Sequence, residues 1–303
     1  MPSPTLTSIR GLTIHIGGIP ILVRTESADF AHLLADRYGE FVTADTLPAV
    51  MELEIRLIDE PGLGARDSGF GEDPDADVSV RLEAGRWVME RGDFHAEWDP
   101  QCHRGWVRQT ANPYAIDGVL RILHSLILAR EGGFLVHAAS AVRNGRAFVL
   151  AGVSGTGKTT LARLAPPDVT LLTDEISYIR PEEQVTGYRE QETGNGFLSP
   201  VTCNLTPAFS AFGTPFAGEL ARIGQKVQAP LAGLFLLQQG PENRIEPLSK
   251  GQAARELMRH ILFFAHDTEL VQMLFQTVCD FVRRVPVRRL VFTPEERVWE
   301  LIV

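Results

Sequence analysis

The residues with the clearest chemical signature lie between Gly152 and Thr160, where the sequence reads Gly-Val-Ser-Gly-Thr-Gly-Lys-Thr-Thr. This run fills every fixed position of the pattern G-x-x-x-x-G-K-[ST], which is typical of loops that bind the phosphates of a nucleotide. Glycines let backbone N–H groups turn inward around a polyphosphate, Lys158 can reach its β- and γ-phosphates, and Thr159 can ligate Mg²⁺. We therefore expect ATP and Mg²⁺ to bind here, through Gly152, Ser154, Gly155, Thr156, Gly157, Lys158, Thr159 and Thr160.

Two adjacent carboxylates, Asp174 and Glu175, follow an apolar stretch, Val169–Leu172, that we expect to form a strand. Carboxylates at a strand end beside a phosphate loop suit two tasks, holding Mg²⁺ and accepting the proton of an attacking hydroxyl. Because few residues separate this strand from Lys158, we expect it to lie next to the strand that enters the loop. A solvated acidic turn is the alternative interpretation.

The strand that enters the loop, Arg146–Ala151, is predicted to form a hairpin with Phe134–Val142. Asn144-Gly145 lies between these two runs, and Asn-Gly in that position favours a type I′ turn. Counting outward from the turn places His137 opposite Gly152, at the root of the loop. His137 is therefore a candidate to contact phosphate or substrate, although it could also simply cap the strand end.

The order of His137, the Asn-Gly hairpin, the GVSGTGKTT loop and the TDEIS segment resembles the bacterial HPr kinase/phosphorylase family. The loop is also similar to that of ATP-dependent phosphoenolpyruvate carboxykinases, which share that family's fold. The resemblance implies an α/β fold class: a P-loop kinase core of the HPr kinase/phosphoenolpyruvate carboxykinase type with a mixed sheet, plus a strand-rich N-terminal domain.

The same resemblance implies roles for individual residues. In that family the first acid after the loop acts as base and the second binds the metal, which makes Asp174 the candidate base and Glu175 a candidate Mg²⁺ ligand, although the family has Asp at the second position. The segment Gly213–Arg222 resembles the GTPF-x-GE segment of HPr-kinase-related proteins and adds Glu219 and Arg222 as candidates, unless it is a surface loop. The implied catalytic set is Asp174, Lys158, His137 and Glu219, and the implied metal set is Thr159, Asp174 and Glu175.

Periodicity and capping signals outline the elements around these residues. Residues 1–110 are predicted to form a strand-rich accessory domain, and residues 111–303 the domain that carries the loop. Asn112 is expected to cap a helix that bridges the two. Closer to the C-terminus, Ser249 begins a capping box, and Thr293-Pro294 is expected to open a last helix.

Charge and cysteine content limit the partners and the compartment. The formal net charge of −9 and the pI of about 5.4 argue against broad binding to nucleic acid or to an anionic membrane, both of which need a basic face. Cys102, Cys203 and Cys279 are widely spaced and form no CxxC motif, which suits a reducing compartment. We therefore expect a cytoplasmic protein, and a homo-oligomer is left open.

The most apolar helical stretch, Ala115–Ala129, is interrupted by Asp117, Arg121 and His124. Charged residues at these positions indicate a core helix rather than a membrane span.

Taken together, these residues predict a kinase that transfers the ATP γ-phosphoryl group to a hydroxyl of a protein, a peptide or a small alcohol. Lys158 and Mg²⁺ would neutralise charge, and Asp174 would take the hydroxyl proton. Two alternatives stay open: a carboxykinase-like enzyme for a small carboxylic acid, and a nucleotide-binding regulator without transferase activity. The histidines near Asp267 fit no metal-ligand spacing well enough to favour a metal hydrolase.

Overall fold

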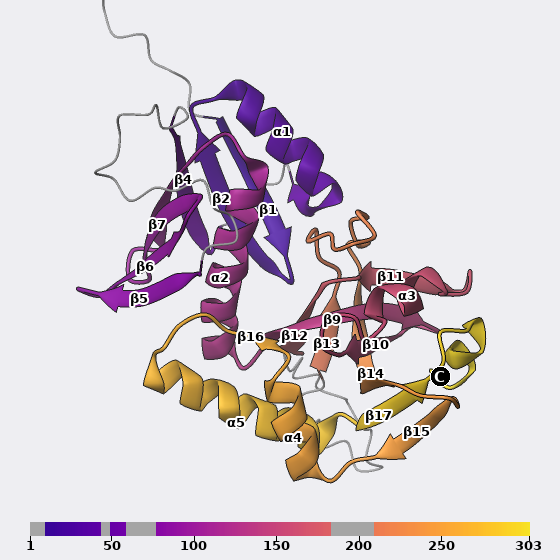
Figure 1. The fold of residues 1–303 in the computed structure, drawn as a ribbon. Helices are drawn as coiled ribbons and strands as arrows, with labels where there is room; N and C mark the ends of the chain where they lie inside the picture. Colours follow the sequence, from indigo (N-terminus) through magenta and orange to yellow (C-terminus); the bar gives the residue numbers. More distant parts are fainter. Residues whose placement is uncertain (1–9, 44–48, 59–76, 183–208) are drawn as a thin grey trace, which may run out of the picture.

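The computed structural model describes residues 10–43, 49–58, 77–182 and 209–303 (Figure 1). Cys203 lies outside these residues, whereas Cys102 and Cys279 are both free thiols. Within the described ranges, no helix has both the length and the apolar composition needed to cross a bilayer.

The N-terminal strands form one eight-stranded sheet in the order β3-β1-β2-β4-β8-β7-β6-β5. The pairs β2–β4 and β4–β8 are parallel, and the other pairs are antiparallel. Gly17 and Gly18, both with positive φ, form the turn between β1 and β2. The strands are β1 (Arg10–Ile16), β2 (Ile19–Thr25), β3 (Val42–Thr43), β4 (Met51–Leu57), β5 (Ser79–Glu83), β6 (Arg86–Arg91), β7 (Phe94–Asp99) and β8 (Arg104–Gln109).

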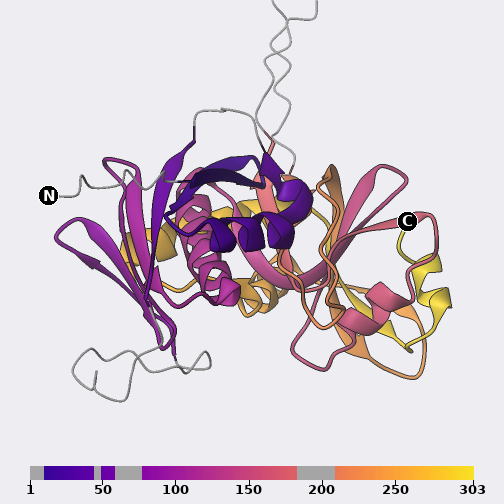
Figure 2. The same cartoon turned by 90° about the horizontal axis from the view of Figure 1, so that it is seen from above.

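Two helices pack on this sheet. In α1 (Ala28–Tyr38) the Ser27 hydroxyl accepts a hydrogen bond from the backbone N–H of Phe30, and a 3₁₀ turn, Gly39–Phe41, follows. The predicted cap of α2 (Pro113–Glu131) is confirmed, because the side chain of Asn112 accepts from the N–H of Tyr114. Helix α2 lies between the two sheets, as Figures 1 and 2 both show.

The C-terminal strands form a second sheet of nine strands with both parallel and antiparallel pairs. Five of them, in the order β10-β9-β12-β13-β14, form a closed ring, because β14 pairs back onto β10. Helices α4 and α5 bury apolar side chains against this sheet. The strands are β9 (Phe134–Arg143), β10 (Arg146–Ala151), β11 (Val169–Thr173), β12 (Ile176–Pro181), β13 (Phe209–Phe212), β14 (Gln228–Gln239), β15 (Arg244–Pro247), β16 (Ile261–Leu262) and β17 (Val287–Phe292), and the helices are α3 (Lys158–Arg163), α4 (Lys250–Met258) and α5 (Thr268–Arg284).

The predicted fold class, an α/β P-loop kinase core with a strand-rich domain attached, is wrong. Of the residues that the structure describes, 41% lie in strands and 29% in helices, so helices do not alternate with strands as covering layers. Only the six-residue α3 follows the glycine-rich loop directly. The strands instead satisfy their backbone groups by closing a ring and extending it into a large mixed sheet.

Two local predictions also need correction. Strand β11 does not lie next to β10, the strand that enters the loop; it pairs with β9 instead, because β9 and β14 occupy the two edges of β10. The helix expected after Thr293-Pro294 is only a 3₁₀ turn, Glu296–Glu300. The capping box of Ser249 and Gln252 at α4 is confirmed.

The division near residue 110 stays a prediction. The first sheet uses residues up to 109 and the second begins at residue 134. However, one continuous apolar core contains residues of the first sheet, of α2 and of the second sheet, including Tyr178, together with Phe216 from the segment after β13. The two sheets therefore share buried surface across α2.

Candidate active site

Strand β9 brings the glycine-rich loop and the acid pair together, because the two segments flank it on opposite edges at the same residue. On one edge Ala138 pairs with Ala151, the last residue before the loop. On the other edge the N–H of Ala138 donates to the carbonyl oxygen of Glu175 at 2.9 Å. Two strand spacings place the root of the loop and the acid pair about 10 Å apart.

The predicted hairpin and its register are confirmed. Asn144 and Gly145 have φ values of 52° and 73°, as a type I′ turn requires, and Arg143 pairs with Arg146. The pairing of the two strands extends to Ala138 and Ala151, so His137 is the next residue outward on β9. His137 itself pairs on the other edge with Ile176, directly after the acids.

An open cleft of about 430 Å³ lies at this junction. It contains ten of the residues that the sequence singled out, and Gly152, Thr156 and Arg222 are not in its lining. In the loop, Thr156 instead donates its hydroxyl to the carbonyl of Val153 at 2.5 Å. The cleft is lined by His137, Ser154, Gly155, Gly157, Lys158, Thr159, Thr160, Asp174, Glu175, Ala217, Gly218 and Glu219.

Lys158 lies under the loop rather than in solvent. Its ammonium group donates to the carbonyl oxygens of Gly152 at 2.8 Å and Val153 at 3.1 Å. Burial lowers the pKa of the Lys158 amine from its ordinary value, while the nearby charges of Glu219 and Glu175 oppose this change. Lys158 is thus held across the loop, near the carboxylates of Glu219 and Glu175.

Backbone amides hold Asp174 on both of its oxygens. Oδ1 accepts from the N–H of Gly218 and Oδ2 from the N–H of Leu220, each at 2.9 Å. The segment can approach this closely only because residue 218 is glycine, since a Cβ there would lie 2.8 Å from Oδ2. The carboxylate, 3% exposed, is therefore fixed in orientation while each oxygen keeps a further lone pair for the cleft.

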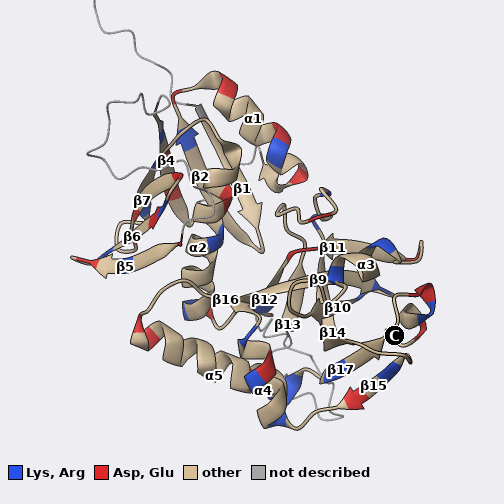
Figure 3. Ribbon diagram, in the orientation of Figure 1, with Lys and Arg blue, Asp and Glu red and all other residues tan. Residues whose placement is uncertain are grey.

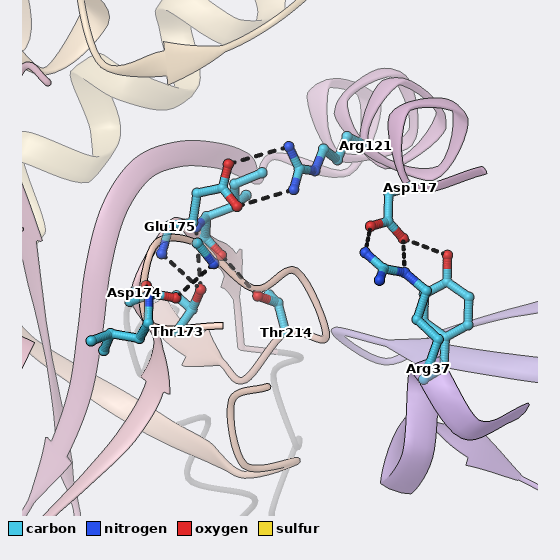
Figure 4. Close-up of polar contacts among 11 residues, drawn as sticks. Arg37, Asp117, Arg121, Thr173, Asp174, Glu175 and Thr214 are labelled. Atoms are coloured by element: carbon cyan, nitrogen blue, oxygen red, sulfur yellow. Dashed lines mark hydrogen bonds and ion pairs between the residues drawn. The ribbon is translucent and has the colours of Figure 1, made fainter. Parts of the chain in front are cut away.

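A side chain, rather than the backbone, holds Glu175. Arg121 of α2 donates to Oε2 at 3.1 Å and to Oε1 at 3.4 Å (Figure 4). Burial raises the pKa of the Glu175 carboxyl above its ordinary value, and Arg121 opposes that rise. The backbone around the acids is fixed by the Thr173 hydroxyl, which accepts from the N–H groups of Glu175 and Ile176.

His137 and His260 both lie near enough to Lys158 for its charge to act on their rings. The N–H of His137 donates to the carbonyl of His260 at 2.8 Å. Burial lowers the pKa of both imidazoles, and the positive charge of Lys158 lowers it further. Both rings are therefore neutral at neutral pH, where a neutral ring nitrogen can accept a hydrogen bond.

These groups fit the ligands that the sequence implies. Mg²⁺ is usually bound by one or two carboxylates together with substrate phosphates, and Asp174, Glu175 and Thr159 supply two carboxylates and a hydroxyl in one cleft. Among the described residues, no group of three or more His, Cys, Asp or Glu is arranged to hold a metal by itself. The loop has glycine where a side chain would collide, since a Cβ on Gly157 would lie 3.0 Å from the ring of Phe292.

Sequence reasoning missed three contributors to the cleft. Arg121 was counted only as a polar interruption of the apolar face of α2. The amide of Leu220 acts through the backbone, so its side-chain type carries no signal. Gln239, at the end of β14, donates to the loop carbonyls of Gly155 and Thr156 at 3.3 Å each, and nothing in its sequence context marks it.

Comparison with known proteins gives one family. A family model described as "SynChlorMet cassette protein ScmC" matches residues 115–303, which is more than half of the chain and includes all the cleft residues named above. A search of curated proteins finds no match.

Proposed function

Because the chain belongs to the SynChlorMet cassette protein ScmC family, whose name states no reaction, we propose its function from the cleft: it is a Mg-ATP-dependent kinase that phosphorylates a hydroxyl. The observation that carries this proposal is that the glycine-rich loop, Lys158 and both acids line one cleft. The likeness of its motifs to HPr kinase/phosphorylase supports the reaction type, not the fold.

In the proposed reaction, the acceptor oxygen forms a bond to the γ-phosphorus of ATP while the bond from that phosphorus to the bridging oxygen breaks, and ADP leaves. Asp174 takes the acceptor's proton, because its carboxylate is already oriented by two amides. Lys158 neutralises charge on the phosphoryl oxygens, and the loop amides orient the phosphates. Mg²⁺, when held by Thr159, Glu175 and Asp174, would add charge neutralisation at the β- and γ-phosphates.

The acceptor is a serine of a protein or peptide, or a small alcohol. A net charge of −9 argues against a nucleic-acid acceptor. Figure 3 agrees, since acidic and basic residues are interspersed on elements of both sheets. The sparse, odd-numbered set of cysteines favours a location in the cytoplasm.

The test is calorimetry with Mg-ATP followed by incubation with γ-labelled ATP and hydroxyl-bearing acceptors. Lys158→Ala should weaken nucleotide binding about 100-fold, because a buried charge-assisted contact is lost. Lys250→Ala, which removes an exposed lysine at the start of α4, is the matched control and should bind like the wild type.

The outcomes separate the alternatives. Transfer of the labelled phosphoryl group to an acceptor would support the proposed kinase activity. Tight binding without transfer to any acceptor would favour a nucleotide-binding regulator. No affinity of the wild type for any magnesium nucleotide would reject the proposal.

A further inference from the structure

Arg121 reaches the acid pair from α2, the helix that lies between the two sheets. It lies on α2, one turn beyond Asp117, and its guanidinium donates a hydrogen bond to each carboxylate oxygen of Glu175 (Figure 4). The side chains of the pair are only 25% and 26% exposed, so solvent screens this contact less than it screens an ordinary surface ion pair. A two-point contact of this kind fixes direction as well as distance.

Arg121 also touches the segment that holds the second acid. Its guanidinium carbon lies 5.0 Å from the centre of the Phe216 ring. Phe216 is fully buried, and two residues later the chain supplies the amide of Gly218 that donates to Asp174. One side chain therefore contacts Glu175 directly and supports the segment that orients Asp174.

The helix that carries Arg121 is anchored to the N-terminal part at the preceding turn. Asp117 is buried and accepts hydrogen bonds from the guanidinium of Arg37 and, at 2.7 Å, from the hydroxyl of Tyr38. Both partners belong to α1. Because a helical turn is rigid, fixing Asp117 also fixes the base of the Arg121 side chain.

Arg121 is not satisfied as a purely structural residue would be. Its Nε atom is buried and has no hydrogen-bond partner among the described residues. A buried donor without a partner costs stability. An arginine at position 121 is therefore better explained by the contact that its Nη atoms make with Glu175 than by a contribution to the stability of the fold.

We propose that Arg121 is a positioning residue that sets the Glu175 carboxylate and the Asp174-holding segment for Mg²⁺-nucleotide, so that the N-terminal part helps build the cleft. This inference rests on the proposed function. It assigns no contact between Arg121 and the nucleotide itself.

The experiment compares nucleotide affinity with Mg²⁺ and with EDTA, using calorimetry and a non-hydrolysable ATP analogue. Arg121→Ala should reduce the Mg²⁺-dependent gain in affinity about tenfold, which corresponds to about 1.4 kcal/mol. The affinity in EDTA should stay within about twofold of wild type, because the loop and Lys158 are untouched. Arg121→Lys should recover only part of the gain, since lysine keeps the charge but not the planar fork.

The matched control is Arg180→Ala. Arg180 is likewise partly buried in an ion pair, with Glu131 at 3.0 Å, but it lies toward the end of β12 away from the acid pair. This variant should keep the full Mg²⁺ gain even if it lowers thermal stability.

If Arg121→Ala lost equal nucleotide affinity with Mg²⁺ and with EDTA, or lost none, the positioning role would be overturned while the proposed function stayed intact. If the wild type itself bound no nucleotide, the proposed function would fail first and this role with it. Should Arg121→Ala not fold, the same two-condition comparison on Arg121→Lys decides.

Discussion

Asp174 and Glu175 are adjacent in sequence but are held in different ways. Asp174 receives two backbone amides, from Gly218 and Leu220, whereas Glu175 receives a guanidinium. A carboxylate fixed by amides cannot turn away without breaking both bonds, which suits a group that must meet an acceptor hydroxyl. A carboxylate fixed by a side chain can exchange part of that contact for a cation.

This difference leads to three expectations for Asp174→Asn. The amide NH₂ must face one of two N–H donors, so one bond is lost and stability should fall by about 1–3 kcal/mol. Phosphoryl transfer should fall at least about 100-fold because the proton acceptor is gone. Nucleotide affinity in EDTA should change little, because the loop is intact. Thermal unfolding, calorimetry and turnover measure the three effects.

Asp168→Asn is the control, since Asp168 is half exposed and pairs with Arg143 away from the cleft. It should leave turnover unchanged. Full turnover in Asp174→Asn would contradict the assignment of the proton acceptor.

At the scale of elements, α2 packs a histidine against β12. His124 is fully buried, its Nδ1 lies 3.1 Å from the hydroxyl of Tyr178, and Arg180 and His15 add nearby positive charge. Burial, aided by Arg180 and His15, lowers the pKa of His124 from 6.5 to about 3. Between these two pH values His124 is therefore neutral in the folded protein and protonated in the unfolded chain.

The sign of the resulting pH dependence follows from proton uptake. Between pH 6.5 and about 3 the unfolded state binds more protons at His124, so stability falls as the pH falls through this window. The slope from this residue approaches about 1.4 kcal/mol per pH unit. His124→Gln should be less stable than wild type at neutral pH but should lose stability more slowly on acidification, as measured by thermal unfolding at a series of pH values.

Tyr178→Phe provides the control, because it removes the hydroxyl partner and leaves the imidazole buried. This variant should lose stability with falling pH as steeply as the wild type does. An unchanged slope in His124→Gln would show that other groups carry the acid sensitivity.

Local signals predicted elements well, and long-range pairing was the part that could not be predicted. Asn144-Gly145 fixed the hairpin because a two-residue turn sets its own register. The position of β11 was mispredicted because β14, which occupies the second edge of β10, comes much later in the chain. The short distance along the chain between Lys158 and β11 gave no sign that β14 would occupy that edge.

The candidate site was predictable only as far as its motifs extend. Lys158, Asp174 and Glu175 were identified because their residue types and order carry chemistry. Arg121 was not, because a single arginine in an apolar helix has no spacing partner in the sequence. Its role depends on where α2 crosses the acid pair, and only the packing of two sheets around α2 determines that.

At the scale of the whole molecule, α2 makes the two sheets share one apolar core. That core includes Trp87 of the first sheet, Leu123 of α2 and Ile176, which directly follows the acid pair. Losing either sheet would expose the apolar side chains that α2 buries against it. We therefore expect the described parts to unfold together rather than as independent domains.

The four tryptophans allow this to be tested. Trp87, Trp98 and Trp106 report on the first sheet, whereas Trp299 is buried against α3 and donates to the carbonyl of Leu161 at 3.1 Å. In Trp299→Phe, tryptophan fluorescence therefore reports only on the N-terminal sheet.

Under the proposed function, Mg-ATP binds the folded cleft and should therefore stabilise everything that unfolds with that cleft. At a free ligand concentration about 100 times the Kd, the gain is about 2.7 kcal/mol. In Trp299→Phe, the fluorescence transition of the N-terminal sheet should shift upward with Mg-ATP as far as the transition followed by circular dichroism does. A nucleotide shift seen by circular dichroism but absent from the fluorescence would mean that the first sheet unfolds alone. The core shared across α2 predicts that the two shifts coincide.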